Sequence, residues 1–170
     1  MNNKNQMKSV DIIIPVYNAL DDLKICLDSL KKYTDLELNR VIIINDNSPD
    51  PNVKIFLDGL NYPWLKVVHN STNKGFSANI NLGMSQSEEN DVVLLNSDTV
   101  LTSNWLPKIV RCAYSSSEIG TVTPVSNNAT LCSVPNFCEE NILPENMSID
   151  KAAEIVERCS FHEYPQITVF

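Results

Sequence analysis

Four short apolar runs rich in β-branched residues recur along the first hundred residues, and they constrain the fold more than any other feature. The first run is short and lacks polar alternation, so it predicts a strand that is buried on both faces. The second run predicts another buried strand, and the other two predict a third and a fourth strand. The runs are residues 10–16 (VDIIIPV), 40–44 (RVIII), 65–69 (LKVVH) and 91–95 (DVVLL).

Segments with helical features separate these runs. Leucines with helical spacing mark the first of them, and Pro51 and Pro107 each suit the first turn of a later helix. Strands that alternate with helices pair in parallel, with the helices covering the sheet. The sequence therefore predicts an α/β fold, a Rossmann-like and mostly parallel sheet flanked by helices, with a further strand at residues 119–125. The predicted helices cover residues 20–30, 51–60, 76–84 and 105–114.

One domain is expected to account for the chain. Residues 1–9 are polar and predict a disordered N-terminus, and residues 10–125 hold the α/β domain. Residues 126–147 are rich in Asn, Pro and Ser without a period, which is typical of a functional or mobile loop. A helix capped by Ser148 follows, and residues 126–170 are expected to belong to the same domain. Because the sequence stops within an apolar run (ITVF), we expect a truncated chain.

Composition restricts the possible partners. The 170 residues carry a formal net charge of −8, which argues against a nucleic-acid partner and an anionic membrane surface, since both select basic patches. The sequence shows neither a signal peptide nor a membrane span, which predicts a cytoplasmic protein. The five cysteines are odd in number and scattered without a CxxC pair, which favours buried, reduced thiols over a zinc site.

Polar residues follow all four predicted strands. In open α/β sheets, ligands bind outside the carboxyl ends of the strands, so these residues predict a site. It would contain two isolated carboxylates, Asp46 and Asp98, and one lysine, Lys74. Neither GxGxxG nor GxxxxGK[ST] occurs, which argues against a dinucleotide-binding loop and a P-loop. A phosphorylated ligand would then need a divalent cation, and Asp98 at a strand end suits that cation.

Four motifs, in this order, resemble the nucleotide-binding half of a family 2 glycosyltransferase, which has the GT-A fold. They are IIIPVYN, INDNSPD, NKGFSANINLG and LLNSDT, and the resemblance covers residues 10–124. It implies transfer of a sugar, with inversion, from a nucleotide-diphosphate sugar of the UDP or dTDP type to an acceptor hydroxyl. It also implies Mg²⁺ or Mn²⁺ as cofactor. A glycan or glycolipid acceptor, as in bacterial polysaccharide biosynthesis, would place the protein in the cytoplasm or peripherally at the inner membrane face.

The resemblance also implies roles for single residues. Pro15 and Tyr17 would line the nucleobase pocket, with Tyr17 able to stack on the ring. Asp46 matches the carboxylate that accepts a hydrogen bond from the base N3–H, a donor that uracil and thymine have and cytosine lacks. Lys74 and Asn79 fall in the segment that flanks the diphosphate and ribose, and Asn79 stands where an arginine is common in the family.

The segment LLNSDT resembles the DxD motif of the family. Its last acid, Asp98, would be the metal ligand between the diphosphate and the protein. Asn96 stands in place of the first acid, which faces the ribose, and an amide can still bind hydroxyls as donor and acceptor. Asp98 is therefore the only charge of the motif.

Other polar residues near the motifs are assigned structural roles. Asp50 is predicted to lie in the first turn of the second helix, where the helix dipole stabilises it. Asn81 and Gly83 are predicted to serve helix packing and capping, and His69 is predicted to be a satisfied edge residue.

Inverting transfer needs a general base, usually a carboxylate. In the family this residue lies in a later acidic motif, which we expect beyond Phe170. This chain is therefore expected to bind donor and metal but to turn over poorly or not at all. Two alternatives stay open: a non-catalytic module that binds nucleotide-sugar, carbohydrate or protein, and a nucleotidyltransferase. The second would ordinarily carry a glycine-rich basic loop after the first strand, which PVYNALDD lacks.

Overall fold

The computed structural model describes residues 8–166. Residues 1–7 and 167–170 lie outside the described residues, and with them most of the predicted disordered N-terminus and the predicted final strand. Contacts divide the chain after Leu101 into two compact units, which are described separately. The sequence analysis expected one domain whose α/β part ends at residue 125, and this stays a prediction.

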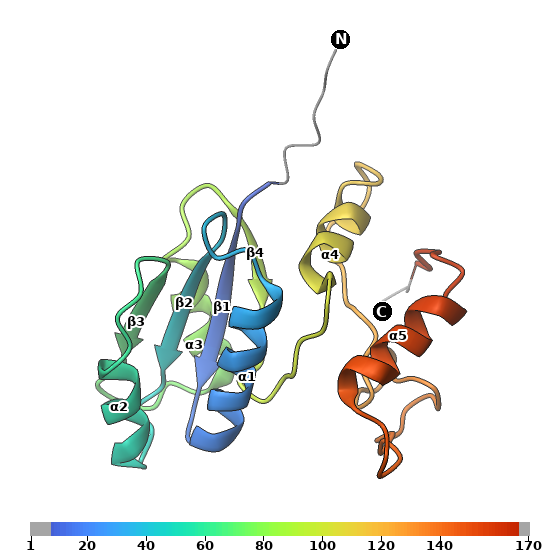
Figure 1. Ribbon diagram of the computed structural model, residues 1–170. Coiled ribbons are helices and arrows are strands. Elements are labelled where there is room, and N and C mark those ends of the chain that lie inside the picture. The colour runs from blue at the N-terminus through green and yellow to red at the C-terminus, as the bar shows by residue number, and fades with distance from the viewer. Residues whose placement is uncertain (1–7, 167–170) are drawn as a thin grey trace. The chain divides into compact units, whose positions relative to one another are not determined.

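Four parallel strands form the sheet of the first unit, in the order β3-β2-β1-β4 (Figure 1). Ile13 of the central strand lies beside Ile42 on β2 and beside Leu94 on β4. The predicted parallel α/β sheet is therefore confirmed, with all four strands close to their expected bounds. These bounds are β1 (Val10–Val16), β2 (Arg40–Asn45), β3 (Leu65–His69) and β4 (Asp91–Leu94).

Three helices cover the sheet: α1 (Leu20–Tyr33), α2 (Pro51–Asp58) and α3 (Phe76–Met84). Right-handed crossovers place α1 and α2 on one face, whereas α3 returns across the other face to reach β4 (Figure 1). Gly83 allows this close approach, because a Cβ at that position would lie 2.3 Å from Ile13 Cγ2. The predicted role of Gly83 in helix packing agrees with this contact.

Asp50 differs slightly from its prediction. It is the N-cap of α2, one position before the helix, and its side chain accepts a hydrogen bond from the Asn52 amide at 2.9 Å. Pro51 occupies the first turn of α2 as predicted. Proline suits this position because the backbone N–H that it lacks would have no partner within the helix. The carboxylate therefore satisfies a backbone donor directly in addition to any favourable interaction with the helix dipole.

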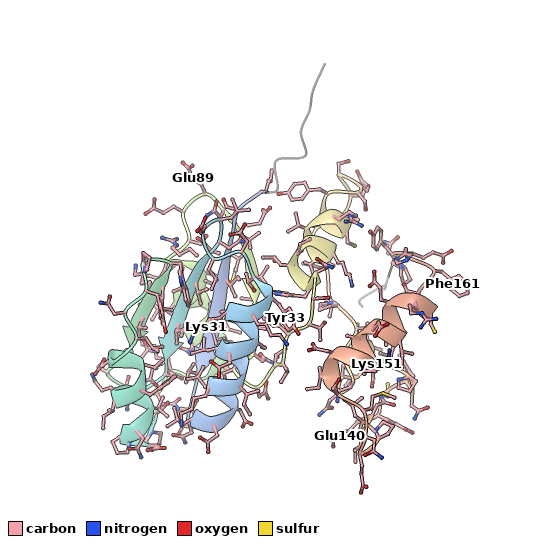
Figure 2. All side chains as sticks on the ribbon, viewed as in Figure 1. Lys31, Tyr33, Glu89, Glu140, Lys151 and Phe161 are labelled. Atoms are coloured by element: carbon pink, nitrogen blue, oxygen red, sulfur yellow. The ribbon has the colours of Figure 1, made fainter. Side chains whose placement is uncertain are left out.

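One fully buried charge lies at the amino-terminal end of the sheet. Asp11 accepts hydrogen bonds from Arg40 Nη2 at 2.7 Å, Arg40 Nε at 3.2 Å and Asn90 Nδ2 at 3.1 Å. Burial raises the pKa of Asp11, but the hydrogen bonds from Arg40, Ser87 and Asn90 together outweigh it and hold the pKa below its usual value. The loop between α3 and β4 supplies Asn90, and Figure 2 shows Glu89 of this loop projecting outward.

The second unit contains α4 (Trp105–Ala113) and α5 (Ile149–Cys159). Ser148 caps α5 as predicted and accepts a hydrogen bond from the Lys151 amide at 3.2 Å. The predicted strand at residues 119–125 is wrong, because no strand of the described residues pairs with it. Gly120 weakens this run and Pro124 lacks an N–H, so the run has little capacity to join a sheet.

The long loop between these helices is held together by its own hydrogen bonds. Asn141 is buried, and its Nδ2 lies 2.8 Å from Ser133 Oγ and 3.2 Å from the Asn127 carbonyl oxygen. The loop therefore has internal structure without helices or sheet. No helix among the described residues is long and apolar enough to cross a membrane.

Candidate functional site

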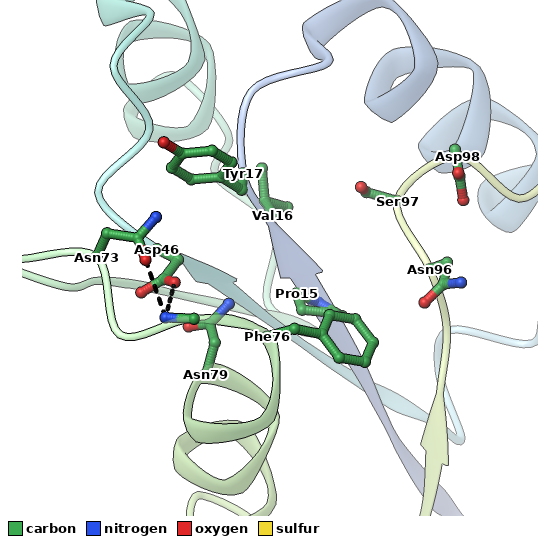
Figure 3. Close-up of a pocket in the computed structure, with 11 residues that line it drawn as sticks. Pro15, Val16, Tyr17, Asp46, Asn73, Phe76, Asn79, Asn96, Ser97 and Asp98 are labelled. Atoms are coloured by element: carbon green, nitrogen blue, oxygen red, sulfur yellow. Dashed lines mark hydrogen bonds between the residues drawn. The ribbon is translucent and has the colours of Figure 1, made fainter.

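A pocket lies at the carboxyl edge of the sheet, within the first unit (Figure 3). It collects residues from the ends of β1, β2 and β4 and from the start of α3. Six of the seven predicted site residues line it, and Lys74 is the exception. The lining residues are Pro15, Val16, Tyr17, Asp46, Asn73, Gly75, Phe76, Asn79, Asn96, Ser97 and Asp98.

The segment that follows β1 holds Tyr17 at the pocket. The Tyr17 side chain is half exposed, which leaves a face of its ring available to a ligand. Asn18 and Ala19 adopt left-handed backbone conformations that turn the chain sharply into α1. The Asn18 amide donates to Ser48 Oγ at 2.9 Å, and Asn18 Oδ1 accepts from the Asp50 amide at 3.2 Å. These bonds tie the segment after β1 to the segment after β2.

Asp46, directly after β2, is buried and already holds three protein donors. Its Oδ1 accepts from Asn70 Nδ2 at 2.7 Å and from the Lys74 amide at 2.9 Å. Its Oδ2 accepts from the Gly75 amide at 2.9 Å, a bond drawn in Figure 3. The carboxylate therefore fixes the loop between β3 and α3, and Asp46 also lines the pocket.

Two buried amides support this carboxylate. Asn79 donates through Nδ2 to the Ile44 carbonyl at 3.0 Å and accepts through Oδ1 from Asn70 Nδ2 at 3.0 Å. The side chain of Asn79 is thus committed largely to the protein. Asn70 was missed as a site residue, although the sequence holds a signal for it: it directly follows β3, as Asp46 follows β2.

Lys74 contributes to the site through its backbone. Its amide donates to Asp46, whereas its exposed side chain is not among those that line the pocket. A role of Lys74 as a phosphate cation stays a prediction.

The segment after β4 forms a turn that contributes Asn96, Ser97 and Asp98 to the pocket. The Thr99 amide donates to the Asn96 carbonyl at 3.2 Å, which places Ser97 and Asp98 at the tip. Beneath it, the buried Cys26 of α1 donates through Sγ to the same carbonyl at 3.6 Å. Burial, with a further contribution from the charge of Asp98, raises the pKa of the Cys26 thiol to about 12.

Asp98 contrasts with Asp46. It is exposed, and no hydrogen-bond donor among the described residues binds its carboxylate. Residues 8–166 contain no group of three or more His, Cys, Asp or Glu side chains that could hold a metal ion. Mg²⁺, however, commonly takes only one or two carboxylates from the protein and its other oxygens from phosphate and water. An uncommitted carboxylate beside a pocket fits that donor set.

Two more residues near the pocket have clear positions. His69 is satisfied as predicted, with Nδ1 3.0 Å from Asn45 Nδ2 and Nε2 3.0 Å from Asp58 Oδ1. Because Ser48 donates to Asn45 Oδ1, the Asn45 nitrogen must donate to His69 Nδ1. Phe76, which sequence reasoning missed, starts α3 and lines the pocket with a mostly exposed ring (Figure 3).

Comparison with known protein families identifies the family of this chain. The family model described as Glycosyl transferase family 2 matches residues 11–132, which include every residue that lines the pocket. The chain belongs to this family. The predicted family and the GT-A fold are therefore confirmed.

Relatives of this chain support the same assignment. The uncharacterized glycosyltransferase YibD of Escherichia coli K12 is 37% identical over 97 residues, which cover 55% of this chain and 27% of YibD. The crystal structure of Staphylococcus aureus TarS 1–349 in complex with UDP-GlcNAc is 25% identical with a TM-score of 0.54, covering 62% of this chain and 31% of that one. The chain thus spans about a third or less of the length of either protein.

A third similarity concerns the fold alone. The crystal structure of GalNAc-T7 with UDP, GalNAc and Mn²⁺ is 18% identical with a TM-score of 0.59, over 64% of this chain and 21% of that one.

Proposed function

We propose that this chain is the donor-binding part of an inverting glycosyltransferase that uses a nucleotide-diphosphate sugar of the UDP or dTDP type. The observation that carries the proposal is the pocket, at which Tyr17, Asp46, Asn96 and Asp98 converge from three different strand ends. These residues supply an aromatic face, a fixed acceptor, a neutral amide and an uncommitted carboxylate, which match the four parts of such a donor complex.

The nucleobase would bind between Tyr17 and Asp46. An ionised carboxylate has about four acceptor positions, and protein donors occupy three of those of Asp46. The remaining position, on Oδ2, can accept one hydrogen bond from the N3–H of uracil or thymine. The half-exposed Tyr17 ring can stack on the base, an arrangement that stabilises aromatic pairs beyond the area they bury.

The ribose and diphosphate would lie toward the turn after β4. Asn96 can bind ribose hydroxyls, and Asp98 would hold Mg²⁺ or Mn²⁺ together with diphosphate oxygens. When bound, the metal supplies positive charge that stabilises the departing nucleoside diphosphate. Lys74, on the loop beside the pocket, is the lysine that we propose for a phosphate contact.

The catalytic base is proposed to come from outside this pocket. Asp46 is committed to backbone and amide donors, and Asp98 is assigned to the metal, so neither is free to accept a proton from the acceptor hydroxyl. We propose a glycan or glycolipid as acceptor. A lipid-linked acceptor would bring the cytoplasmic protein to the inner face of the membrane.

Calorimetric titration of the chain with UDP, in Mn²⁺ and in EDTA, tests the proposal. Binding is expected to be tighter in Mn²⁺, and Asp98→Asn is expected to remove most of that difference. Glu89→Gln is the matched control, because it removes the same charge from an exposed residue on the loop before β4, at the other end of the sheet (Figure 2). Absence of UDP binding under both conditions would refute the proposed function and favour an interaction module.

A further inference from the structure

A directed series of hydrogen bonds connects the backbone of β2 to the Asp46 carboxylate. The Ile44 carbonyl can only accept, so the Asn79 atom 3.0 Å from it must be the side-chain amide nitrogen Nδ2. Asn79 Oδ1 therefore faces Asn70 and accepts from its Nδ2 at 3.0 Å. The second hydrogen of that Nδ2 then points to Asp46 Oδ1, 2.7 Å away. Every donor and acceptor in the series is determined by the one before it.

The surrounding backbone holds this series in place. The Asn70 amide donates to the Asn45 carbonyl at 2.9 Å, which continues the β2–β3 pairing by one residue. Asp46, Asn70 and Asn79 are all more than nine-tenths buried, so water does not compete freely for their bonds. Asp46 Oδ1 is thus held by two donors from fixed directions, and the carboxylate cannot rotate without breaking both.

We propose that Asn70 and Asn79 are positioning residues that determine which nucleobase the pocket accepts. The inference rests on the proposed function, in which Asp46 faces the base. An ionised carboxylate can only accept hydrogen bonds, and the three protein donors determine where its remaining acceptor position lies. Uracil and thymine offer a donor at N3, whereas cytosine offers an acceptor there and meets a second acceptor. By holding this acceptor in one position, the series allows the carboxylate to select bases that carry an N3–H.

An Asp46→Asn variant separates this inference from a purely structural role. Asn70 and the Lys74 amide both donate toward the position of Oδ1, so the amide oxygen of the variant is held there. Because Oδ1 has two donors and Oδ2 only one, the new NH₂ group takes the place of Oδ2. One of its hydrogens then opposes the Gly75 amide, at a cost common to both nucleotides, and the other faces the base. Preference is expected to move from uracil toward cytosine, and a residue that only stabilised the loop would produce no such reversal.

The experiment is calorimetric titration of the full chain with UDP and with CDP in Mn²⁺. The unsubstituted chain is expected to bind UDP at least about tenfold more tightly than CDP, as expected for one hydrogen bond to a charged group. Asp46→Asn is expected to lower this ratio below one. Asn70→Ala is expected to bring it to within about threefold of one, whereas the exposed Asn81→Ala on α3 should leave it unchanged.

Each outcome has a defined meaning. If Asn70→Ala weakens both nucleotides equally and keeps the ratio, Asn70 has only a structural role and the inference is wrong. If circular dichroism shows that Asn70→Ala does not fold, Asp46→Asn decides, and an unchanged preference for UDP overturns the inference. Failure of the unsubstituted chain to bind either nucleotide would instead refute the proposed function on which the inference rests.

Discussion

Gly83→Ala is expected to destabilise the first unit, because α3 lies against the sheet at this residue. A Cβ at Gly83 would lie 2.3 Å from Ile13 Cγ2 and 3.2 Å from Ile44 Cγ1. Both isoleucines are completely buried in the centre of the sheet, in the cluster on which α3 packs. The new methyl group therefore has no space unless the helix or a strand moves.

The magnitude follows from two opposing effects. Non-bonded carbons prefer about 3.5–4.0 Å, so relief of the clash needs a shift of roughly 1 Å or more. Such overpacking costs about 1–3 kcal/mol, and the depth of this clash favours the upper end. Alanine is better than glycine within a helix by about 1 kcal/mol. The expected net loss is about 2 kcal/mol, a large share of a stability that is about 5–15 kcal/mol in ordinary domains.

Urea unfolding followed by far-UV circular dichroism measures this loss. Gly59→Ala is the matched control in the same unit, since its Cβ would meet nothing closer than the Phe56 carbonyl oxygen at 3.4 Å and its φ of −78° suits alanine. Ile13→Ala removes the clashing methyl, so it should cost less in the Gly83→Ala background than alone. Equal stability of Gly83→Ala and Gly59→Ala would refute the reasoning.

Two further predictions follow from the buried groups. Asp11→Asn is expected to cost about 3 kcal/mol at neutral pH, the lower end for a broken buried pair, because the Arg40 side chain is 41% exposed. The folded-state pKa of Asp11 is lowered, so its stabilisation is present above the unfolded-state pKa and is lost as pH falls through the folded-state pKa. The urea midpoints of the unsubstituted chain and of Asp11→Asn should therefore converge in acid. Cys26 should resist iodoacetamide at mildly alkaline pH, whereas the exposed Cys138 and Cys159 should react. Mass spectrometry of the labelled chain measures this difference, and rapid labelling of Cys26 would contradict its burial.

The centre of the sheet was predictable because β1 and β2 are buried along nearly their whole length, whereas the edge strands β3 and β4 are only partly buried. A continuous apolar run such as residues 10–16 has only one stable place in a domain of this kind, the middle of a covered parallel sheet. The helix α3 was also predicted with its observed bounds, and the structure shows Gly75 at its N-cap with a positive φ of 79°. Local sequence and tertiary burial agree in these elements.

The predicted strand at residues 119–125 shows where this reasoning stops. A strand depends on a neighbour that its own sequence does not specify, and no strand of the described residues pairs with it. Asn70 was missed for a similar reason, because its role depends on Asp46 and Asn79 in other elements of the fold. Pattern alone cannot show that the Asn70 amide donates both to a buried carboxylate and to a second buried amide.

The contrast between Asp46 and Asp98 depends on burial. Both come after a strand, yet Asp46 is buried with three donors and Asp98 is exposed with none among the described residues. A fixed carboxylate can select one hydrogen-bond pattern, whereas an exposed one can adjust to an ion and its waters. Because Asn96 adds no charge beside Asp98, the proposed metal would depend on diphosphate oxygens for most of its ligands. By linkage, metal and nucleotide should then raise each other's affinity by the same factor.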